Sequence, residues 1–311
     1  MFSIIVPVWN RAGIAGRTLA SIAAQTYRPL QLVLVDNDST DGTLDVLRAF
    51  KRVHERDDFE ILVTGESRHS AGAARNRGLS LATGGHVLFF DSDDTMAPTL
   101  VERYHETFAS PGRPDIVVVA RRFVDADGHI EPHPLHKGGD QLARHLLHST
   151  LATQAFAVSR PWLDRCGTWD EELPAWNDLE MGCRLLLPSP RLAWIDEPLV
   201  DVRSSGEASI TGTGFSTRHG QWELSLDKIA RDIAAAPLHD VRRYMRLVDY
   251  RRLALAAAYE REQRPDLSAP LKAEALAHLG TSLRLRLAMP WLYRRMVAGR
   301  RGSARVARLL I

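Results

Sequence analysis

Four short apolar runs in the first third of the chain are separated by stretches whose apolar residues recur at helical spacing. The runs cover residues 2–8, 32–35, 60–64 and 87–90. Apolar runs of this length, bounded by polar turn residues, are typical of buried strands. Strands that alternate with helices in this way predict an α/β fold with a mostly parallel sheet, flanked by helices and joined by right-handed connections.

Polar and acidic side chains follow three of these runs, at the point where each predicted strand ends. In chain order they are Asn10, Asp36, Asp38, Asp91, Asp93 and Asp94. The ends of parallel strands meet at one edge of a sheet, where open α/β sheets bind ligands, so we expect these side chains to gather there. Arg75 falls early in a helix predicted over residues 71–82, with Ser70 as its N-cap, and is expected near the same edge.

Asp91 and Asp93 are two residues apart, so on an extended chain their carboxylates point the same way and repel each other unless a cation lies between them. A divalent cation that carries a phosphate suits such a pair, because Mg²⁺ prefers one or two carboxylates together with substrate phosphates. An ordinary solvated turn or a helix N-cap is the alternative, and the turn alternative applies equally to Asp36 and Asp38.

Charge is unevenly distributed along a chain whose formal net charge is only +2. Residues 275–311 contain eight arginines and no aspartate or glutamate, so the remainder is net acidic. Two cysteines are too few for a disulfide scaffold or a structural zinc site, which favours a reducing compartment. Without a signal-peptide pattern or an apolar run of about 20 residues, a cytoplasmic protein is expected.

The pattern changes after residue 120. Asp127-Gly128 between apolar residues indicates a hairpin, and residues 204–214, rich in Ser, Thr and Gly, indicate a mobile loop. From about residue 218 the pattern is helical to the end, with interruptions expected near Pro237, Pro265, Pro270 and Pro290.

Four motifs in order resemble glycosyltransferase family 2, whose members have the nucleotide-sugar-binding GT-A fold. The first two are Ile5-Val6-Pro7-Val8-Trp9-Asn10 and Val35-Asp36-Asn37-Asp38-Ser39-Thr40-Asp41-Gly42-Thr43. The third is Ala74-Arg75-Asn76-Arg77-Gly78 ahead of Phe90-Asp91-Ser92-Asp93-Asp94, and the fourth is Asn177-Asp178 ahead of Arg184-Leu185. Each motif alone is weak, but four in the right order are specific.

The resemblance covers residues 1–215, which are expected to form a GT-A catalytic domain. Its nucleotide-binding half would be residues 1–120 and its acceptor half residues 121–215. Residues 216–311 are expected to form a helical, Arg-rich C-terminal extension.

The resemblance implies an inverting, metal-dependent transferase of hexosyl or N-acetylhexosaminyl groups. Its donor would be a nucleotide-diphosphate sugar, with a UDP-sugar preferred. Its acceptor would be a hydroxyl of a glycan or lipid-linked compound in surface polysaccharide biosynthesis.

The same resemblance assigns roles to individual residues. Donor contacts would come from Pro7, Val8, Asn10, Asp36, Arg75 and Asp91, with Pro7, Val8 and Asp36 at the nucleobase and Asp91 at the ribose. Asp93 would hold Mg²⁺ or Mn²⁺ on the diphosphate. Asp178 would be the general base that takes the proton of the acceptor hydroxyl.

Several residues keep more than one interpretation. The role of Asp38 is open, and Asp94 either caps the following helix or supports the water shell of the metal. Glu180 is the second choice for the base, and a plain helix N-cap is the alternative for Asp178. Trp176 either stacks on a sugar or packs in the core, and His219 either completes the metal shell or is structural.

The Arg-rich C-terminal segment has three interpretations: contact with an anionic membrane surface, binding to nucleic acid, and packing on the catalytic domain. Peripheral contact at the inner face of a membrane is preferred, and nucleic acid is not expected as a partner. Two other functions stay open. One is a sugar-phosphate nucleotidyltransferase, for which residues 9–13 are a poor phosphate loop. The other is a non-catalytic nucleotide-sugar-binding protein, which would not need Asp178.

Overall fold

The computed structural model of the chain describes residues 1–203, 214–279, 283–300 and 302–311. The segment that the sequence predicts as a mobile loop, residues 204–214, lies outside the described residues except for Gly214.

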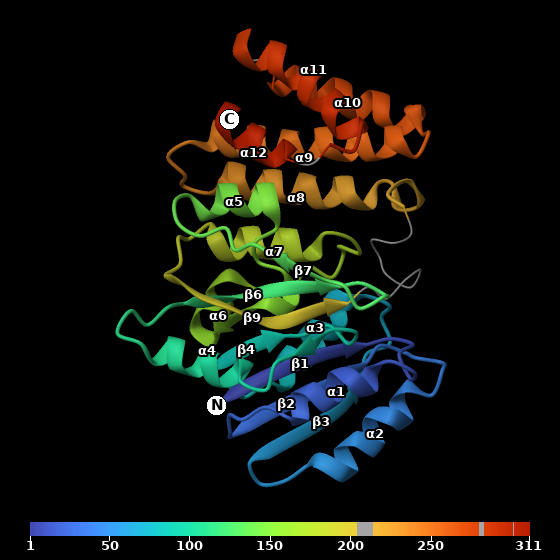
Figure 1. Ribbon diagram of the computed structural model, residues 1–311, viewed down its shortest axis with the longest axis vertical. Helices are drawn as coiled ribbons and strands as arrows, with labels where there is room; N and C mark the ends of the chain where they lie inside the picture. Colours follow the sequence, from blue (N-terminus) through green and yellow to red (C-terminus); the bar gives the residue numbers. More distant parts are fainter. Residues whose placement is uncertain (204–213, 280–282, 301) are drawn as a thin grey trace.

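The first half of the sheet is a parallel α/β unit (Figure 1). Its strands lie in the order β3-β2-β1-β4. Their bounds are β1 Phe2–Val8, β2 Leu30–Asp36, β3 Phe59–Gly65 and β4 His86–Phe89, and the helices between them are α1 Ala15–Ala23, α2 Thr43–His54 and α3 Ala71–Leu81. The four apolar runs are therefore strands, and Ser70 caps α3 as predicted, because its hydroxyl accepts from the Ala73 amide.

The second half of the sheet is mixed. β8 (Phe156–Ser159) runs antiparallel to β4, and β6 (Ile116–Val124) runs antiparallel to β8. β9 (Leu192–Arg203) then lies parallel to β6, with β5 (Thr95–Met96) antiparallel at its far side. β7 (Ile130–His133) forms the predicted hairpin with β6. The α/β class is confirmed, but the sheet is wholly parallel only in its first half, because β8 enters in the opposite direction.

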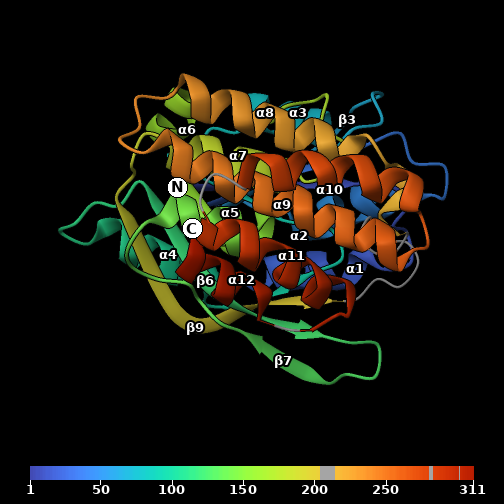
Figure 2. The ribbon, with the colours of Figure 1, turned by 90° about the horizontal axis from the view of Figure 1, so that it is seen from above.

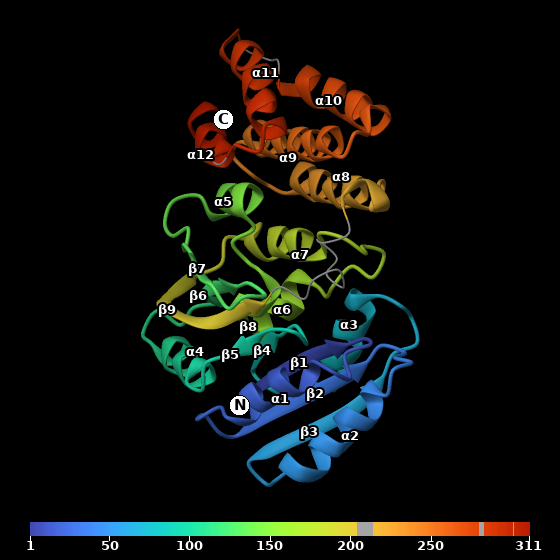
Figure 3. The same ribbon diagram turned by 45° about the vertical axis from the view of Figure 1, so that its right-hand side comes forward.

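Five helices stack at the end of the molecule opposite β2 and β3 (Figures 1 and 3). They are α8 Gln221–Ala235, α9 Val241–Arg261, α10 Pro265–Leu279, α11 Leu283–Val297 and α12 Ser303–Leu310. Pro237 lies between α8 and α9, and Pro265 is the first residue of α10, where proline is tolerated. Pro270 and Pro290 lie inside α10 and α11, so the interruptions expected there are wrong. None of the helices in the described ranges is long and apolar enough to cross a membrane.

The remaining helices connect this stack to the sheet. α5 (Gln141–His148) and α7 (Asn177–Leu186) lie beneath the stack, α4 (Leu100–Ala109) and α6 (Arg160–Cys166) lie beside the sheet, and the β6–β7 hairpin extends to one side (Figure 2). One apolar cluster runs from the sheet through α5 and α7 into α8–α11. Because this cluster crosses residue 215, the division of the chain at that residue stays a prediction.

Helix α3 packs very close to β1 and β2, and Gly78 permits the approach. A Cβ atom at this position would overlap Ile5 Cγ2 and lie 3.1 Å from Val35 Cγ2. A close-packed interior accommodates such an atom only by shifting its neighbours. Gly78, the glycine of the third motif, therefore sets the distance between α3 and the sheet. That distance in turn sets the position of Arg75 on the same helix.

Two helical glycines make a matched test of this packing. We expect Gly78→Ala to lower the free energy of unfolding by about 1–3 kcal/mol through overpacking. Gly16→Ala in α1, where a Cβ atom meets nothing within 4 Å, is expected to raise it by about 0.5–1 kcal/mol. Urea unfolding of both variants measures the difference, and an equal effect of the two substitutions would contradict it.

Candidate functional site

The loops after β1 and β2 are tied together by a few hydrogen bonds. The Asn10 amide donates to Ser39 Oγ at 3.0 Å, and Asn10 Oδ1 accepts from the Thr40 amide at 2.8 Å. Asn10 has a left-handed backbone with φ of 49°, a conformation that asparagine tolerates better than most residues. The side chain of Asn10 therefore holds the two loops in place at the sheet edge.

Asp36 ends β2 with one carboxylate oxygen that accepts no hydrogen bond from the described residues. It lies in register with Val8, as Val35 does with Pro7, and is only 6% exposed. Its Oδ2 accepts weakly from the Ser39 amide at 3.4 Å, but Oδ1 has no hydrogen-bond partner among the residues that the structure describes. A buried acceptor without a donor is costly and marks a place where an N–H group of a ligand fits.

Asp38 is placed differently from Asp36. It is exposed, has φ of 61°, and lies 3.3 Å from Nε2 of the equally exposed His69. This geometry is that of a turn residue at the protein surface.

The guanidinium of Arg75 joins three separate parts of the chain. Nη2 donates to Asp91 Oδ1 at 2.9 Å, and Nη1 donates to Asn177 Oδ1 at 3.5 Å. The group lies over the buried ring of Trp169, 4.4 Å from its centroid. Arg75 therefore links the acidic loop after β4 to the start of α7, which the sequence places about 85 residues apart.

The acidic loop contains one carboxylate that is almost fully buried. Asp94 is 3% exposed and accepts from the Arg203 amide at 2.9 Å. Burial, together with the negative charges of Asp91 and Asp93, raises the pKa of the Asp94 carboxyl to about 8. The following helix, α4, begins at Leu100 after Thr99, so Asp94 does not cap it and that alternative is wrong.

A divalent cation fits this loop by charge. Residues 91–94 include three carboxylates, and the charges of Asp91 and Asp93 disfavour ionisation of Asp94 unless a positive charge is close. Asp93 is accessible to one, because its side chain is 22% exposed, against 31% for Asp91, and its Oδ2 lies 3.8 Å from Arg11 Nη2. One protein carboxylate, completed by substrate phosphates and water, is an arrangement that Mg²⁺ accepts.

A second cluster of possible metal ligands lies in the β6–β7 turn, and the hydrogen bonds of that turn account for it. Asp125, Asp127 and His129 are exposed at the β6–β7 hairpin, and within the described ranges they alone bring three ligand atoms within 4.8 Å of one another. Asp125 Oδ1 already accepts from the amides of Asp127 and His129, at 3.0 and 2.8 Å. These hydrogen bonds close the hairpin without any ion.

Asp178 is the second residue of α7 and not its N-cap. Trp176 occupies the cap position with a left-handed φ of 47°, so the plain N-cap interpretation of Asp178 is wrong. Asp178 Oδ1 accepts from the Leu179 amide at 2.9 Å. Burial raises the pKa of the half-buried Asp178 carboxyl, while the Leu179 amide and the Arg75 guanidinium oppose the rise. A raised pKa suits a group that must accept a proton.

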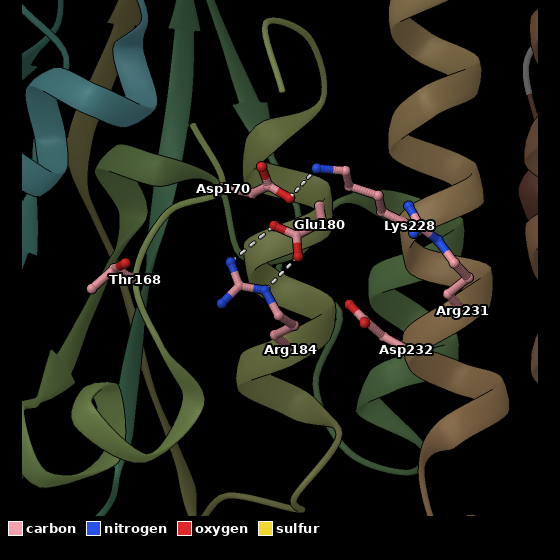
Figure 4. Close-up of a pocket in the computed structure, with 7 residues that line it drawn as sticks. All are labelled: Thr168, Asp170, Glu180, Arg184, Lys228, Arg231 and Asp232. Carbon is pink, nitrogen blue, oxygen red and sulfur yellow. Dashed lines mark hydrogen bonds and ion pairs between the residues drawn. The ribbon is translucent and has the colours of Figure 1, made fainter. Parts of the chain in front are cut away.

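Glu180 lies two residues further along the same helix and therefore points to a different side from Asp178. Figure 4 shows it facing Arg184. It is 2% exposed, and both of its oxygens accept from Arg184, one of them from Nη2 at 2.9 Å. The pair borders a cavity of about 420 Å³ between α7 and α8, lined also by Thr168, Asp170, Lys228, Arg231 and Asp232. Lys228 Nζ from α8 lies 2.5 Å from Asp170 Oδ2, so opposite charges inside this cavity neutralise each other.

The contacts of Trp176 and His219 are with neighbouring protein groups. The ring of Trp176 packs 5.1 Å from Trp222 and 6.3 Å from Phe215, which favours the core interpretation. His219 is exposed, and its Nδ1 lies 3.3 Å from the Ser216 carbonyl of its own turn. A role for His219 at a metal stays a prediction.

Sequence reasoning missed Arg121. This arginine is 9% exposed on β6, and its Nε has no partner among the described residues. Burial lowers the pKa of its guanidinium, while the charges of Asp178 and Asp94 act in the opposite direction. The available signal was the pair Arg121-Arg122 immediately after the apolar run of residues 116–120. Arg122 pairs with Asp201, which leaves Arg121 as the cation that faces inward.

Comparison with known sequences identifies the same family as the four motifs. A family model described as "Glycosyl transferase family 2" matches residues 3–167, more than half of the chain. The PGL/p-HBAD biosynthesis glycosyltransferase of Mycobacterium tuberculosis is 41% identical over 97 residues, which cover 31% of this chain and 36% of that protein. The chain thus spans about a third of the length of this curated relative.

Solved structures match over nearly the whole chain. S. aureus TarS 1–349 in complex with UDP-GlcNAc has a TM-score of 0.70 at 20% identity, covering 98% of this chain and 90% of that chain. The mannosyltransferase PcManGT from Pyrobaculum calidifontis, in complex with GDP-Man and Mn²⁺, has a TM-score of 0.57 at 20% identity, with coverages of 99% and 86%. At these identities the likeness shows a shared fold.

The two carboxylates of α7 are expected to respond oppositely to neutralisation. Glu180→Gln leaves the Arg184 guanidinium without its counter-charge, so the free energy of unfolding should fall by about 3 kcal/mol. Asp178 forms no ion pair with any described residue, and burial disfavours its charge, so Asp178→Asn should leave stability unchanged or raise it. Urea unfolding at neutral pH measures both variants, and a larger loss in Asp178→Asn would refute the assignment.

Proposed function

The chain belongs to glycosyltransferase family 2, and from that premise we propose that it is an inverting, metal-dependent glycosyltransferase. It moves a hexosyl or N-acetylhexosaminyl group from a UDP-sugar to a hydroxyl of a glycan or lipid-linked acceptor. The observation that carries this proposal is the linkage through Arg75, which holds Asp91 of the acidic loop near the half-buried carboxylate of Asp178.

The nucleotide is proposed to bind at the ends of β1 and β2. Pro7 and Val8 flank the nucleobase, and the unpartnered oxygen of Asp36 accepts from the N–H of uracil. Asn10 fixes the loop beside it, while Asp91, oriented by Arg75, accepts from the ribose hydroxyls. TarS, which shares the fold, binds UDP and UDP-GlcNAc, and this supports a uridine nucleotide.

Mg²⁺ or Mn²⁺ is proposed to bind at Asp93. A divalent cation there would neutralise the charge that develops on the diphosphate as it leaves. Asp94, buried next to Asp93, contributes further negative charge to the loop once it is ionised. A fold neighbour, PcManGT, contains Mn²⁺ together with its nucleotide sugar, which supports the same arrangement here.

Asp178 is proposed as the general base. As the acceptor oxygen forms its bond to the anomeric carbon, the proton of the hydroxyl passes to the Asp178 carboxylate. The bond from the anomeric carbon to the diphosphate oxygen breaks on the opposite face, so the configuration inverts and no covalent enzyme intermediate forms. Glu180 is less suited to this role, because Arg184 occupies both of its oxygens.

The place of the reaction is also part of the proposal. A cytoplasmic enzyme of surface polysaccharide biosynthesis, held at the inner face of a membrane by residues of its C-terminal extension, would meet lipid-linked acceptors there. Nucleic acid is not proposed as a partner.

Catalysis by Asp178 predicts a specific loss and a specific pH dependence. UDP release from a panel of UDP-sugars with Mn²⁺ should fall about 10²- to 10⁴-fold in Asp178→Asn. In the native protein, kcat/KM should fall as pH drops through the raised pKa of Asp178, above the range of an ordinary aspartate. That acid limb should be absent in the variant.

Glu180→Gln is the control for this experiment. At temperatures where this variant is folded, its kcat/KM should still fall at low pH as in the native protein. A limb that moves in Glu180→Gln and not in Asp178→Asn would exchange the roles of the two residues. Pyrophosphate formed from UTP and a sugar phosphate would instead favour a nucleotidyltransferase. Binding without turnover of any sugar donor would favour a non-catalytic binding protein.

The unpartnered oxygen of Asp36 predicts nucleotide selectivity. UDP with Mn²⁺ should raise the melting temperature of the native protein, since a ligand that binds only the folded state stabilises it. Asp36→Ala should weaken UDP binding roughly 10- to 100-fold, as expected for loss of a charge-assisted hydrogen bond. Asp38→Ala, at the exposed neighbour, should bind UDP like the native protein. Equal binding by both variants would place the nucleobase elsewhere.

A further inference from the structure

The apolar side chains of α11 divide into two sets on different sides of the helix. Leu285, Met289, Leu292, Tyr293 and Met296 are buried against the rest of the helical stack. Leu283, Leu287 and Trp291 are 73%, 71% and 49% exposed. They are spaced four residues apart, so they form one stripe along the helix. The helix has already buried one apolar face, and the outer stripe is a second one.

Helix α12 adjoins α11 and exposes one further large apolar side chain. Arg284 Nη2 on α11 donates to the Leu309 carbonyl at 2.6 Å, which fixes the end of α12 beside the start of α11. The Leu309 side chain is itself 67% exposed. Two adjoining helices therefore expose four large apolar side chains, three of them in one stripe along α11. Contiguous exposed apolar patches of this kind mark interaction sites more often than scattered single residues do.

The charged side chains of α11 and α12 are all of one sign. Arg284, Arg286 and Arg294 are exposed on α11, and Arg305 and Arg308 are exposed on α12. Residues 275–311 contain no carboxylate side chain to offset them. Arg295 lies over the ring of Trp291, 5.1 Å from its centroid, so cation and aromatic ring are held together. The outer face thus combines apolar insertion groups with a surrounding set of guanidinium groups.

The combination of exposed apolar side chains and arginines favours one kind of binding partner over the others. A nucleic acid would use the arginines but would leave the leucines in water. An anionic lipid surface uses both, because apolar side chains enter the boundary of the acyl chains while Arg groups meet lipid phosphates. The face lies on α11 and α12, at the end of the molecule opposite β2 and β3, so an occupant there leaves the strand ends accessible (Figures 1 and 3).

We propose that Leu283, Leu287, Trp291 and Leu309, with the arginines around them, dock the protein on the surface of an anionic bilayer. The proposed function places the protein at the inner face of a membrane, and this proposal names the residues that would hold it there. It rests on that function only for its biological purpose, because the binding itself requires no catalysis.

Vesicle co-sedimentation of the full chain tests the proposal. The native protein should bind vesicles of phosphatidylcholine with about 30% phosphatidylglycerol and should bind pure phosphatidylcholine at least about tenfold more weakly. The double variant Leu287→Glu/Trp291→Glu should lose at least about tenfold in affinity for the anionic vesicles. Val53→Glu is the matched control, because Val53 is 75% exposed on α2, and its binding should equal that of the native protein.

A second variant separates the two contributions. Arg286→Gln/Arg294→Gln should weaken binding to anionic vesicles about tenfold or more, at roughly 1 kcal/mol per arginine, and should reduce its sensitivity to salt. Native-like binding by the Leu287/Trp291 variant would overturn the docking face and leave only diffuse electrostatic attraction. A native dimer in light scattering that dissociates in that variant would assign the face to a second copy of the chain, and would also overturn the proposal.

The catalytic readout keeps this test separate from the proposed function. UDP release in the absence of vesicles should be the same for the native protein, both double variants and Val53→Glu. Loss of vesicle binding with full turnover would support the docking face. Absence of turnover in every protein, with vesicle binding as expected, would contradict the proposed function and leave the docking face in place.

Discussion

Arg75 carries a positive charge beneath the surface at the point where three distant segments meet. A buried charge is stable only when it is paired and hydrogen-bonded, and Arg75 finds Asp91, Asn177 and the face of Trp169. Each partner comes from a different part of the fold: the acidic loop, the start of α7 and the loop before it. This guanidinium therefore connects the two halves of the candidate site. The distance of Arg75 from the sheet depends in turn on Gly78, which lets α3 approach β1 and β2.

The start of α7 shows how one helix separates two carboxylates into different tasks. Residues two apart on a helix point about 200° from each other, so Asp178 and Glu180 cannot share an environment. Glu180 faces the charged cavity beside α8 and is held by Arg184, whereas Asp178 faces the side of Arg75 and Arg121. Burial without an ion pair raises the pKa of Asp178. Burial also raises the pKa of Glu180, but there the paired guanidinium opposes the rise. The first environment suits proton transfer and the second suits attachment of α7 to α8.

The C-terminal helices serve two surfaces at once. Their inner face belongs to the apolar cluster that runs down to the sheet through α5 and α7, so they support the helix that carries Asp178. Their outer face, on α11 and α12, bears leucines, a tryptophan and arginines that no other described part of the chain covers. A helix with apolar residues on both sides needs a second partner, and the charge of this face indicates an anionic one.

Much of the first half of the chain was predictable, because its signals are local. Apolar runs and helical spacing identify β1–β4 and the helices between them. The rule that parallel strands end at one edge predicts that Asp91 and Arg75 lie close together, and Arg75 Nη2 donates to Asp91 Oδ1 at 2.9 Å. The prolines show where local reasoning fails. Pro265 begins a helix, but α10 and α11 continue through Pro270 and Pro290, because tertiary packing offsets the loss of one backbone hydrogen bond.

The sequence by itself determined the parallel α/β unit, the acidic strand ends and the family motifs, since each of these follows from residue spacing and order. Only the tertiary structure decided the antiparallel entry of β8, the pairing of Glu180 with Arg184, the packing of Trp176 and the inward position of Arg121. It also decided which leucines of α11 face outward. The physical reason is the same in each case: burial and pairing depend on partners that lie far away in the chain, and residue spacing carries no information about them.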